Sequence, residues 1–149
     1  MIKYITDSSI FSSRMQTITN PCNCIGVMGK GLALEFKIRW PGMFDDYVQL
    51  CKNKEIRIGH PYLYKLSTPW ILNFPTKRTL APSRISYIVT GLSYLKNTYR
   101  TLGITSLAVP ALGCGYGGLE WEKVRPILVK YLEKWDIPVE IYRLKGVIK

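Results

Sequence analysis

The stretch TITNPCNCIGVMGKGLALEFKIRW, residues 17–40, contains three kinds of local sequence in succession. β-branched residues open it at 17–19, glycines cluster at 26–31, and apolar residues then alternate with charged ones until Pro41 ends the run. A strand that leads through a glycine-rich loop into a helix is the building unit of α/β domains, and such a loop lies at the sheet edge where ligands bind. The stretch therefore predicts an α/β fold with a binding loop at 26–31.

The rest of the chain continues the alternation of strand-like and helix-like segments. The segments expected are strands at 2–5, 61–64, 70–74, 106–109 and 138–142, helices at 31–40, 42–53, 83–102 and 120–135, and a loop or single helical turn at 7–13. In the longest helix, Ser83 is the expected N-cap and Gly103 the expected C-terminal glycine. No linker, charge block or repeat interrupts the sequence, so we expect one domain over residues 1–149.

The composition is that of a globular domain, with 47% hydrophobic and 21% charged residues among 149. The first residues lack the apolar run of a signal peptide and no window is apolar enough to span a membrane, so we expect a cytoplasmic protein. The 21 Lys and Arg residues exceed the 10 Asp and Glu residues, which gives a net charge of +11. Such an excess indicates an anionic partner, first of all nucleic acid. Phosphate-rich small molecules, an anionic membrane surface and plain solubilising charge are the alternatives.

The four cysteines do not form a metal-binding pattern. Cys22 and Cys24 are a close pair, Cys51 and Cys114 stand alone, and the single histidine, His60, is remote in sequence. Four-cysteine zinc sites usually combine two close pairs. We therefore expect reduced thiols that pack in the interior, and neither a metal nor a cofactor.

Two glycine-rich loops, at 26–31 and 113–118, each lie between a strand-like and a helix-like segment. Glycine lets the backbone approach a pyrophosphate closely, and a helix N-terminus supplies unpaired N–H groups. Two such loops at one sheet edge would hold a diphosphate from both sides. Neither loop matches a P-loop or a complete dinucleotide-binding fingerprint, and a purely structural turn is the alternative for each.

Residues 73–78, NFPTKR, combine a strand end with a basic turn. A lysine at the end of a strand in an α/β fold can face the ligand cleft. If it is partly desolvated beside another cation, such as Arg78, the pKa of the Lys77 amine falls and the amine becomes a usable nucleophile or base. The alternative is a solvated lysine in a surface turn.

Three stretches in this order, residues 20–37, 73–78 and 110–121, resemble the ligand-binding motifs of macrodomains, in particular those of the DarG-like branch. The resemblance extends over essentially the whole chain. It implies a three-layer α/β/α macrodomain with a central mixed β-sheet that binds ADP-ribose in a cleft at the strand ends. It also implies a monomeric enzyme that removes ADP-ribose from thymidine in single-stranded DNA and so reverses the action of a partner, an ADP-ribosyltransferase toxin.

The resemblance also assigns roles to individual residues. Lys77 would be the catalytic lysine, acting at the anomeric carbon that carries the base, and Asn23 would contact the distal ribose near that bond. Independently of the resemblance, the basic residues around the cleft are candidate contacts for DNA phosphates: Arg78 and Arg84, together with Lys30, Lys37 and Arg39. The residues expected to bind ADP-ribose are Ser9, Ile10, Asn20, Val27, Met28, Gly29, Lys30, Gly31, Thr76, Pro110, Leu112, Gly113, Cys114, Gly115, Tyr116, Gly117 and Gly118.

The chain departs from related motifs at two places. Its second loop reads Tyr116-Gly117-Gly118, without the aspartate of related protein-directed glycohydrolases, so a lysine–aspartate relay is excluded and a DNA substrate is favoured. Near the start, Asp7 does not match the aspartate with which macrodomains often bind adenine. Backbone groups around Ser9 and Ile10 are therefore expected to take that role.

Three other functions stay open on the sequence. The chain could be a non-catalytic reader that binds ADP-ribose, a hydrolase of small or protein-linked ADP-ribose derivatives, or a nucleic-acid-binding domain with structural glycine loops. A reader would keep its affinity without Lys77, and a hydrolase of small molecules would show little dependence on salt. No residue is identified that reads a base edge, so thymidine follows from the resemblance alone.

Overall fold

Six strands form one mixed sheet in the computed structural model, which describes residues 1–143. Their order across the sheet is β1-β6-β5-β2-β4-β3, and every neighbouring pair is parallel except β3 with β4. The strands are β1 (Ile2–Ile5), β2 (Thr17–Asn23), β3 (Tyr62–Tyr64), β4 (Trp70–Lys77), β5 (Leu107–Pro110) and β6 (Val139–Tyr142). The predicted mixed sheet is confirmed.

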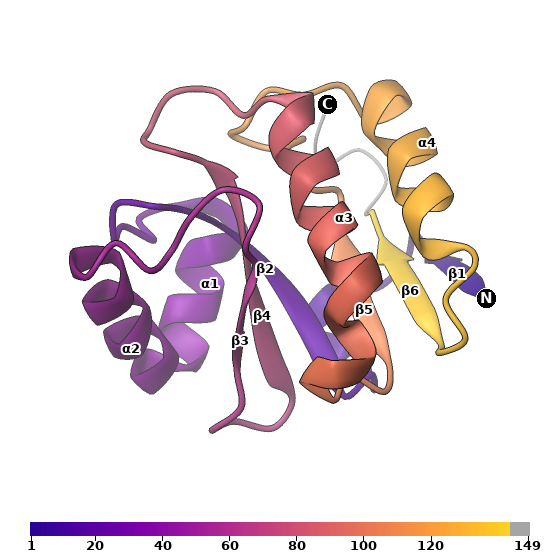
Figure 1. Cartoon of the computed structure of the whole chain (residues 1–149), viewed down its shortest axis with the longest axis horizontal. Coiled ribbons are helices and arrows are strands. Elements are labelled where there is room, and N and C mark those ends of the chain that lie inside the picture. Colours follow the sequence, from indigo (N-terminus) through magenta and orange to yellow (C-terminus); the bar gives the residue numbers. More distant parts are fainter. Residues whose placement is uncertain (144–149) are drawn as a thin grey trace.

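Two pairs of helices cover the two faces of this sheet (Figure 1). α1 (Gly31–Arg39) and α2 (Pro41–Lys52) pack on one face, and α3 (Ile85–Leu102) and α4 (Trp121–Leu132) pack on the other. A short 3₁₀ helix, η1 (Ile10–Ser12), precedes β2. Each face buries its own apolar cluster, which confirms the expected three-layer arrangement. No helix within residues 1–143 combines the length and the apolar character needed to cross a membrane.

The central strands β2 and β4 are longer than the sequence predicted. They continue through Asn23 and Lys77, whereas the predicted segments stop earlier because asparagine and proline are rare in strands. Inside the sheet Asn20 and Asn73 are aligned, and Asn20 Nδ2 donates to Asn73 Oδ1 at 3.0 Å, so that the two amides partly satisfy each other. Because β2 and β4 are parallel and Asn23 is paired with Lys77, these two residues reach the same edge of the sheet side by side.

The predicted cap of the longest helix is wrong. α3 begins at Ile85 after Arg84, and no side chain caps it. The Ser83 backbone N–H instead donates to the Gly117 carbonyl oxygen at 3.0 Å, and the Ser83 side chain is buried against the second glycine-rich loop. Ser83 therefore makes a tertiary contact with the second loop and does not make the local hydrogen bond that would cap α3. The expected end of the helix is confirmed, since Gly103 has a φ of +86° and its N–H bonds to carbonyls of the last turn.

Candidate active site

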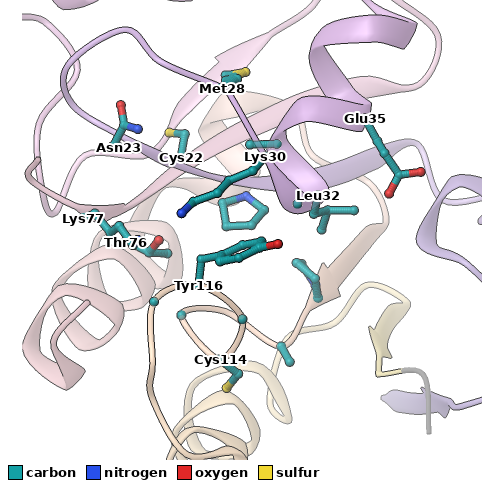
Figure 2. Close-up of a pocket in the computed structure, with 18 of the residues that line it drawn as sticks. Cys22, Asn23, Met28, Lys30, Leu32, Glu35, Thr76, Lys77, Cys114 and Tyr116 are labelled. Atoms are coloured by element: carbon teal, nitrogen blue, oxygen red, sulfur yellow. The ribbon is translucent and has the colours of Figure 1, made fainter. Parts of the chain in front are cut away.

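A cavity of about 890 Å³ opens between the two glycine-rich loops, at the carboxyl ends of β2, β4 and β5 (Figure 2). Most residues expected to bind ADP-ribose line it, together with Asn23 and Lys77. These residues are Ser9, Ile10, Val27, Met28, Gly29, Lys30, Gly31, Thr76, Pro110, Gly113, Cys114, Gly115, Tyr116 and Gly117. Its size is typical of small-molecule sites, and its place matches the edge where open α/β sheets bind ligands.

Three of the expected ligand contacts do not line the cavity. Asn20 is fully buried beneath it, where its amide bonds to Asn73 and lies 3.6 Å from the Met28 sulfur. Leu112 is fully buried in the apolar cluster under α3 and α4. The Gly118 N–H is used inside its own loop, donating to the Gly115 carbonyl oxygen at 3.1 Å. These three residues therefore lie outside the lining of the cavity.

Lys77 is the last residue of β4, is half-buried and lines the cavity, so of the two alternatives left open by the sequence it is the cleft lysine and not a solvated lysine in a surface turn. Burial lowers the pKa of its amine, and the nearby Lys30 ammonium lowers this pKa further. The expected neighbour, Arg78, is not the cation responsible: its guanidinium lies 5.7 Å from the centre of the Tyr87 ring. Figure 2 shows Lys30 reaching across the cavity from the first loop, with its nitrogen on the Lys77 side. The neighbouring charge thus comes from the opposite wall.

Asn23 holds the first loop in shape. Its Nδ2 donates to the Val27 carbonyl oxygen at 2.8 Å, and its Oδ1 accepts the Ile25 N–H at 3.1 Å and the Val27 N–H at 3.4 Å. The Tyr47 hydroxyl of α2 lies 2.6 Å from the same Oδ1. Burial raises the pKa of this hydroxyl, so it stays protonated and donates. One Nδ2 hydrogen is left for a ligand, so Asn23 positions the loop and can also contact a ribose.

The second loop presents a row of free backbone donors. The N–H groups of Cys114 and Gly118 bond inside the loop, whereas those of Gly115, Tyr116 and Gly117 have no partner within residues 1–143. Opposite them, the first turn of α1 starts at Gly31 without a side-chain cap, so its N–H groups are also unpaired. Converging N–H groups and a helix N-terminus form an anion-binding site. The cavity is therefore suited to a diphosphate, as the two-loop pattern predicted.

Tyr116 and Lys30 connect the two loops across the cavity. The Lys30 ammonium lies 4.5 Å from the centre of the Tyr116 ring, and the ring remains 65% exposed. A Cβ atom at Gly31 would lie 3.0 Å from this ring, and Gly31 has a φ of +63°, so glycine is required here on two grounds. Tyr116 is thus a lining residue at the mouth of the cavity.

Several residues of the site were not predicted from the sequence. Tyr47 was expected only within the helix at 42–53, and Ser83 only as a helix cap. Tyr142 and Arg143 also line the cavity, at the end of β6. They could have been found from the rule that carboxyl ends of parallel strands share one edge. The contacts of Tyr47 and Ser83 join distant segments and leave no local signal.

Comparison with known proteins agrees with this geometry. The model of the family described as "Macro domain" matches residues 19–128. The chain is 44% identical over 137 residues to the DNA ADP-ribosyl glycohydrolase of Mycobacterium tuberculosis, a match that covers 88% of this chain and 39% of that protein. It spans about two fifths of the length of the bacterial curated relatives that it matches.

Solved structures are also similar. The macrodomain of Mycobacterium tuberculosis DarG superposes with a TM-score of 0.89 at 42% identity, covering 95% of this chain and 97% of that one. Thermosipho africanus DarTG in complex with ADP-ribose superposes with a TM-score of 0.90 at 44% identity, covering 95% of this chain and 41% of that one. With its two loops and its cavity at the strand ends, this chain belongs to the macrodomain family and resembles the DarG macrodomains over nearly their whole length.

Proposed function

We propose that this chain is an ADP-ribosyl hydrolase that removes ADP-ribose from a nucleobase in single-stranded DNA. The preferred site of the modification in this proposal is thymidine. The observation that carries the proposal is the Lys77 amine, whose pKa is lowered at the mouth of a cavity suited to a diphosphate. Relatives named DNA ADP-ribosyl glycohydrolase support the DNA substrate. The net charge of +11 is consistent with a polyanionic substrate.

In this proposal the cavity orients ADP-ribose along its length. The free N–H groups of the second loop and of the first turn of α1 bind the diphosphate. The adenine lies toward Ser9 and Ile10, and the distal ribose lies between Asn23 and Lys77, which end adjacent strands. This orientation places the anomeric carbon of the distal ribose next to Lys77, whose unprotonated amine can act as a base or a nucleophile.

The reaction breaks the bond between that anomeric carbon and the base nitrogen. In the net reaction, water supplies a hydroxyl group to the carbon and a proton to the departing base. The neutral Lys77 amine either attacks the carbon first, forming a C–Nζ bond that water then hydrolyses, or accepts the proton of the attacking water. Both routes need the unprotonated amine, which a lowered pKa makes more abundant near neutral pH.

The proposed substrate implies partners of a definite kind. A DNA-directed ADP-ribosyltransferase must supply ADP-ribosylated DNA, and the similar Thermosipho africanus protein is named a fusion of a DNA ADP-ribosyl transferase and a DNA ADP-ribosyl glycohydrolase. We propose that such a transferase accompanies this chain in the cytoplasm and that residues 1–149 act as a single monomeric domain.

The test is a denaturing-gel assay of the purified chain on single-stranded oligonucleotides that carry ADP-ribose on thymidine or, separately, on guanosine. We expect the shift caused by ADP-ribose to disappear from the thymidine substrate. Loss from guanosine only would overturn the choice of base. Absence of turnover on both, with calorimetric binding of free ADP-ribose intact, would identify a reader and contradict the proposed activity.

The effect of Lys30 on Lys77 gives a prediction for pH dependence. Because the unprotonated amine reacts, turnover should rise with pH through the lowered pKa of Lys77 and level off above it. Lys30→Met removes one cause of the lowering, so the pKa of Lys77 rises and the single-turnover profile moves to higher pH. Burial, the larger cause, remains, so the shift is partial. Lys37→Met, in α1 outside the cavity lining, is the control and should leave the profile in place. An unmoved profile in Lys30→Met would contradict the assignment.

A further inference from the structure

The charges of this chain are distributed unevenly around the cavity. Residues 56–119 contain no Asp or Glu, although they form β3, β4, α3, β5 and the second loop. The Lys and Arg residues in this segment are Arg57, Lys65, Lys77, Arg78, Arg84, Lys96 and Arg100. On the opposite side, Glu35 of α1 lines the cavity, and Figure 2 shows it across the cavity from Lys77. At the cavity, the segment 56–119 therefore presents only cations to a polyanion, whereas the α1 side presents the Glu35 carboxylate as well as Lys30.

The connection from β4 to α3 concentrates this charge beside Lys77. Arg78 and Arg84 are exposed, and their guanidinium carbons lie 5.7 and 6.0 Å from the centre of the same Tyr87 ring. Leu80 between them is 66% exposed and also lines the cavity. Neither Arg78 nor Arg84 forms an ion pair with a carboxylate within residues 1–143. We call residues 78–84 together with Tyr87 the basic rim.

The basic rim is fixed to the catalytic cavity at both ends. It starts directly after Lys77, the last residue of β4. At its other end, the Ser83 N–H donates to the Gly117 carbonyl oxygen of the second loop at 3.0 Å. A strand of nucleic acid held on this rim would therefore keep a fixed distance from the Lys77 amine.

The cations of α1 are less suitable. Lys37 and Arg39 lie in the last turn of α1, outside the cavity lining, which ends on this helix at Glu35. At 1.5 Å per residue they are roughly 3–6 Å further along the helix axis than Glu35. Their charged groups rest on the rings of Phe44 and Phe11, at 4.4 and 4.1 Å. They carry the same charge as the two arginines of the basic rim, which makes them a matched control.

We propose that single-stranded DNA on either side of the modified base lies along the basic rim, so that the strand leaves the cavity over the β4–α3 connection and not over α1. This inference rests on the proposed function. Arg78 and Arg84 contact backbone phosphates, while the exposed Leu80 and the Tyr87 ring contact a flanking base. A single strand fits because the base that reaches Lys77 must leave any stack, at a cost that a flexible strand avoids.

The experiment compares two double variants of the full chain, R78A/R84A and K37A/R39A. Binding of an unmodified single-stranded oligonucleotide is measured by fluorescence anisotropy at several salt concentrations, and ADP-ribose affinity is measured by calorimetry. We expect R78A/R84A to weaken DNA binding by about tenfold or more and to reduce the salt slope by about 1.4, at about 0.7 per phosphate contact in a single strand. Its ADP-ribose affinity should stay unchanged, and K37A/R39A should retain both affinities.

Turnover separates this inference from the proposed function. On an ADP-ribosylated oligonucleotide, kcat/KM should fall in R78A/R84A by a factor similar to the loss of DNA affinity, while hydrolysis of an ADP-ribosylated mononucleoside should not change. If the wild-type chain hydrolyses the modified oligonucleotide and both double variants bind DNA equally, the inference is overturned and the function stands. If the wild-type chain hydrolyses nothing, the function fails, and the anisotropy comparison still decides whether DNA lies on the basic rim.

Discussion

Lys77→Ala is expected to reduce turnover of the ADP-ribosylated strand by at least about 10²-fold, the lower range for loss of an acid–base or nucleophilic group. ADP-ribose affinity should change by less than about tenfold, or about 1.4 kcal/mol, because we propose that unpaired backbone N–H groups of the two loops bind the diphosphate. Single-turnover rates and calorimetry on the same preparations measure the two quantities. A wild-type rate in Lys77→Ala would refute the catalytic assignment.

Lys77→Arg separates the two ways in which a lysine can act. Arginine keeps the positive charge but does not lose its proton in a protein. If the unprotonated amine reacts, Lys77→Arg should be as inactive as Lys77→Ala, whereas a purely electrostatic role would be largely retained. Trapping with borohydride during turnover then distinguishes nucleophile from base, because only the nucleophilic route gives a glycosylamine at Lys77, and opening of its ribose ring yields an imine that borohydride reduces.

The fold was largely predictable because local sequence and tertiary structure agree in most elements. The stretch 17–40 predicts a strand, a glycine-rich loop and a helix, and the structure has β2, that loop and α1. The ends of β2 and β4 were not predictable, because Asn20 looks like a turn residue until its amide is paired with Asn73, and because Pro75 looks like the end of a strand. A polar residue is stable in a central strand only when its partner is placed correctly.

The sequence predicted which residues line the cavity better than it predicted the contacts between them. The sequence offered Arg78 as an example of a cation that could lower the pKa of Lys77, whereas the structure supplies Lys30 from the first loop. The link from Tyr47 to Asn23 likewise joins α2 to the end of β2. Residue spacing predicts contacts within one helix or strand. The interactions of Lys30 with Lys77 and of Tyr47 with Asn23 join different segments, and they form only in the folded chain.

Gly117→Val is expected to produce the second large effect, a loss of ADP-ribose affinity of about 10- to 100-fold. A Cβ atom at Gly117 would meet Ser83 Oγ and would lie 2.5 Å from the Gly113 carbonyl oxygen, inside the turn of the second loop. Backbone must move to relieve such contacts, at a typical cost of about 1–3 kcal/mol. Because the Gly115, Tyr116 and Gly117 N–H groups form the proposed phosphate site, the movement displaces the donors themselves.

The matched control is Gly118→Asn, one residue further along the same loop. Gly118 has a φ of +81°, which asparagine tolerates better than other side chains, and nothing lies within 4 Å of its Cβ position. We expect Gly118→Asn to keep ADP-ribose affinity within about threefold, a difference below about 1 kcal/mol. Thermal melting without ligand shows whether either variant unfolds the chain. A folded Gly117→Val with unchanged affinity would mean that this loop does not bind the phosphates. A loss confined to Gly117→Val would locate the diphosphate at the second loop, because crowding inside the turn is the feature that the control lacks.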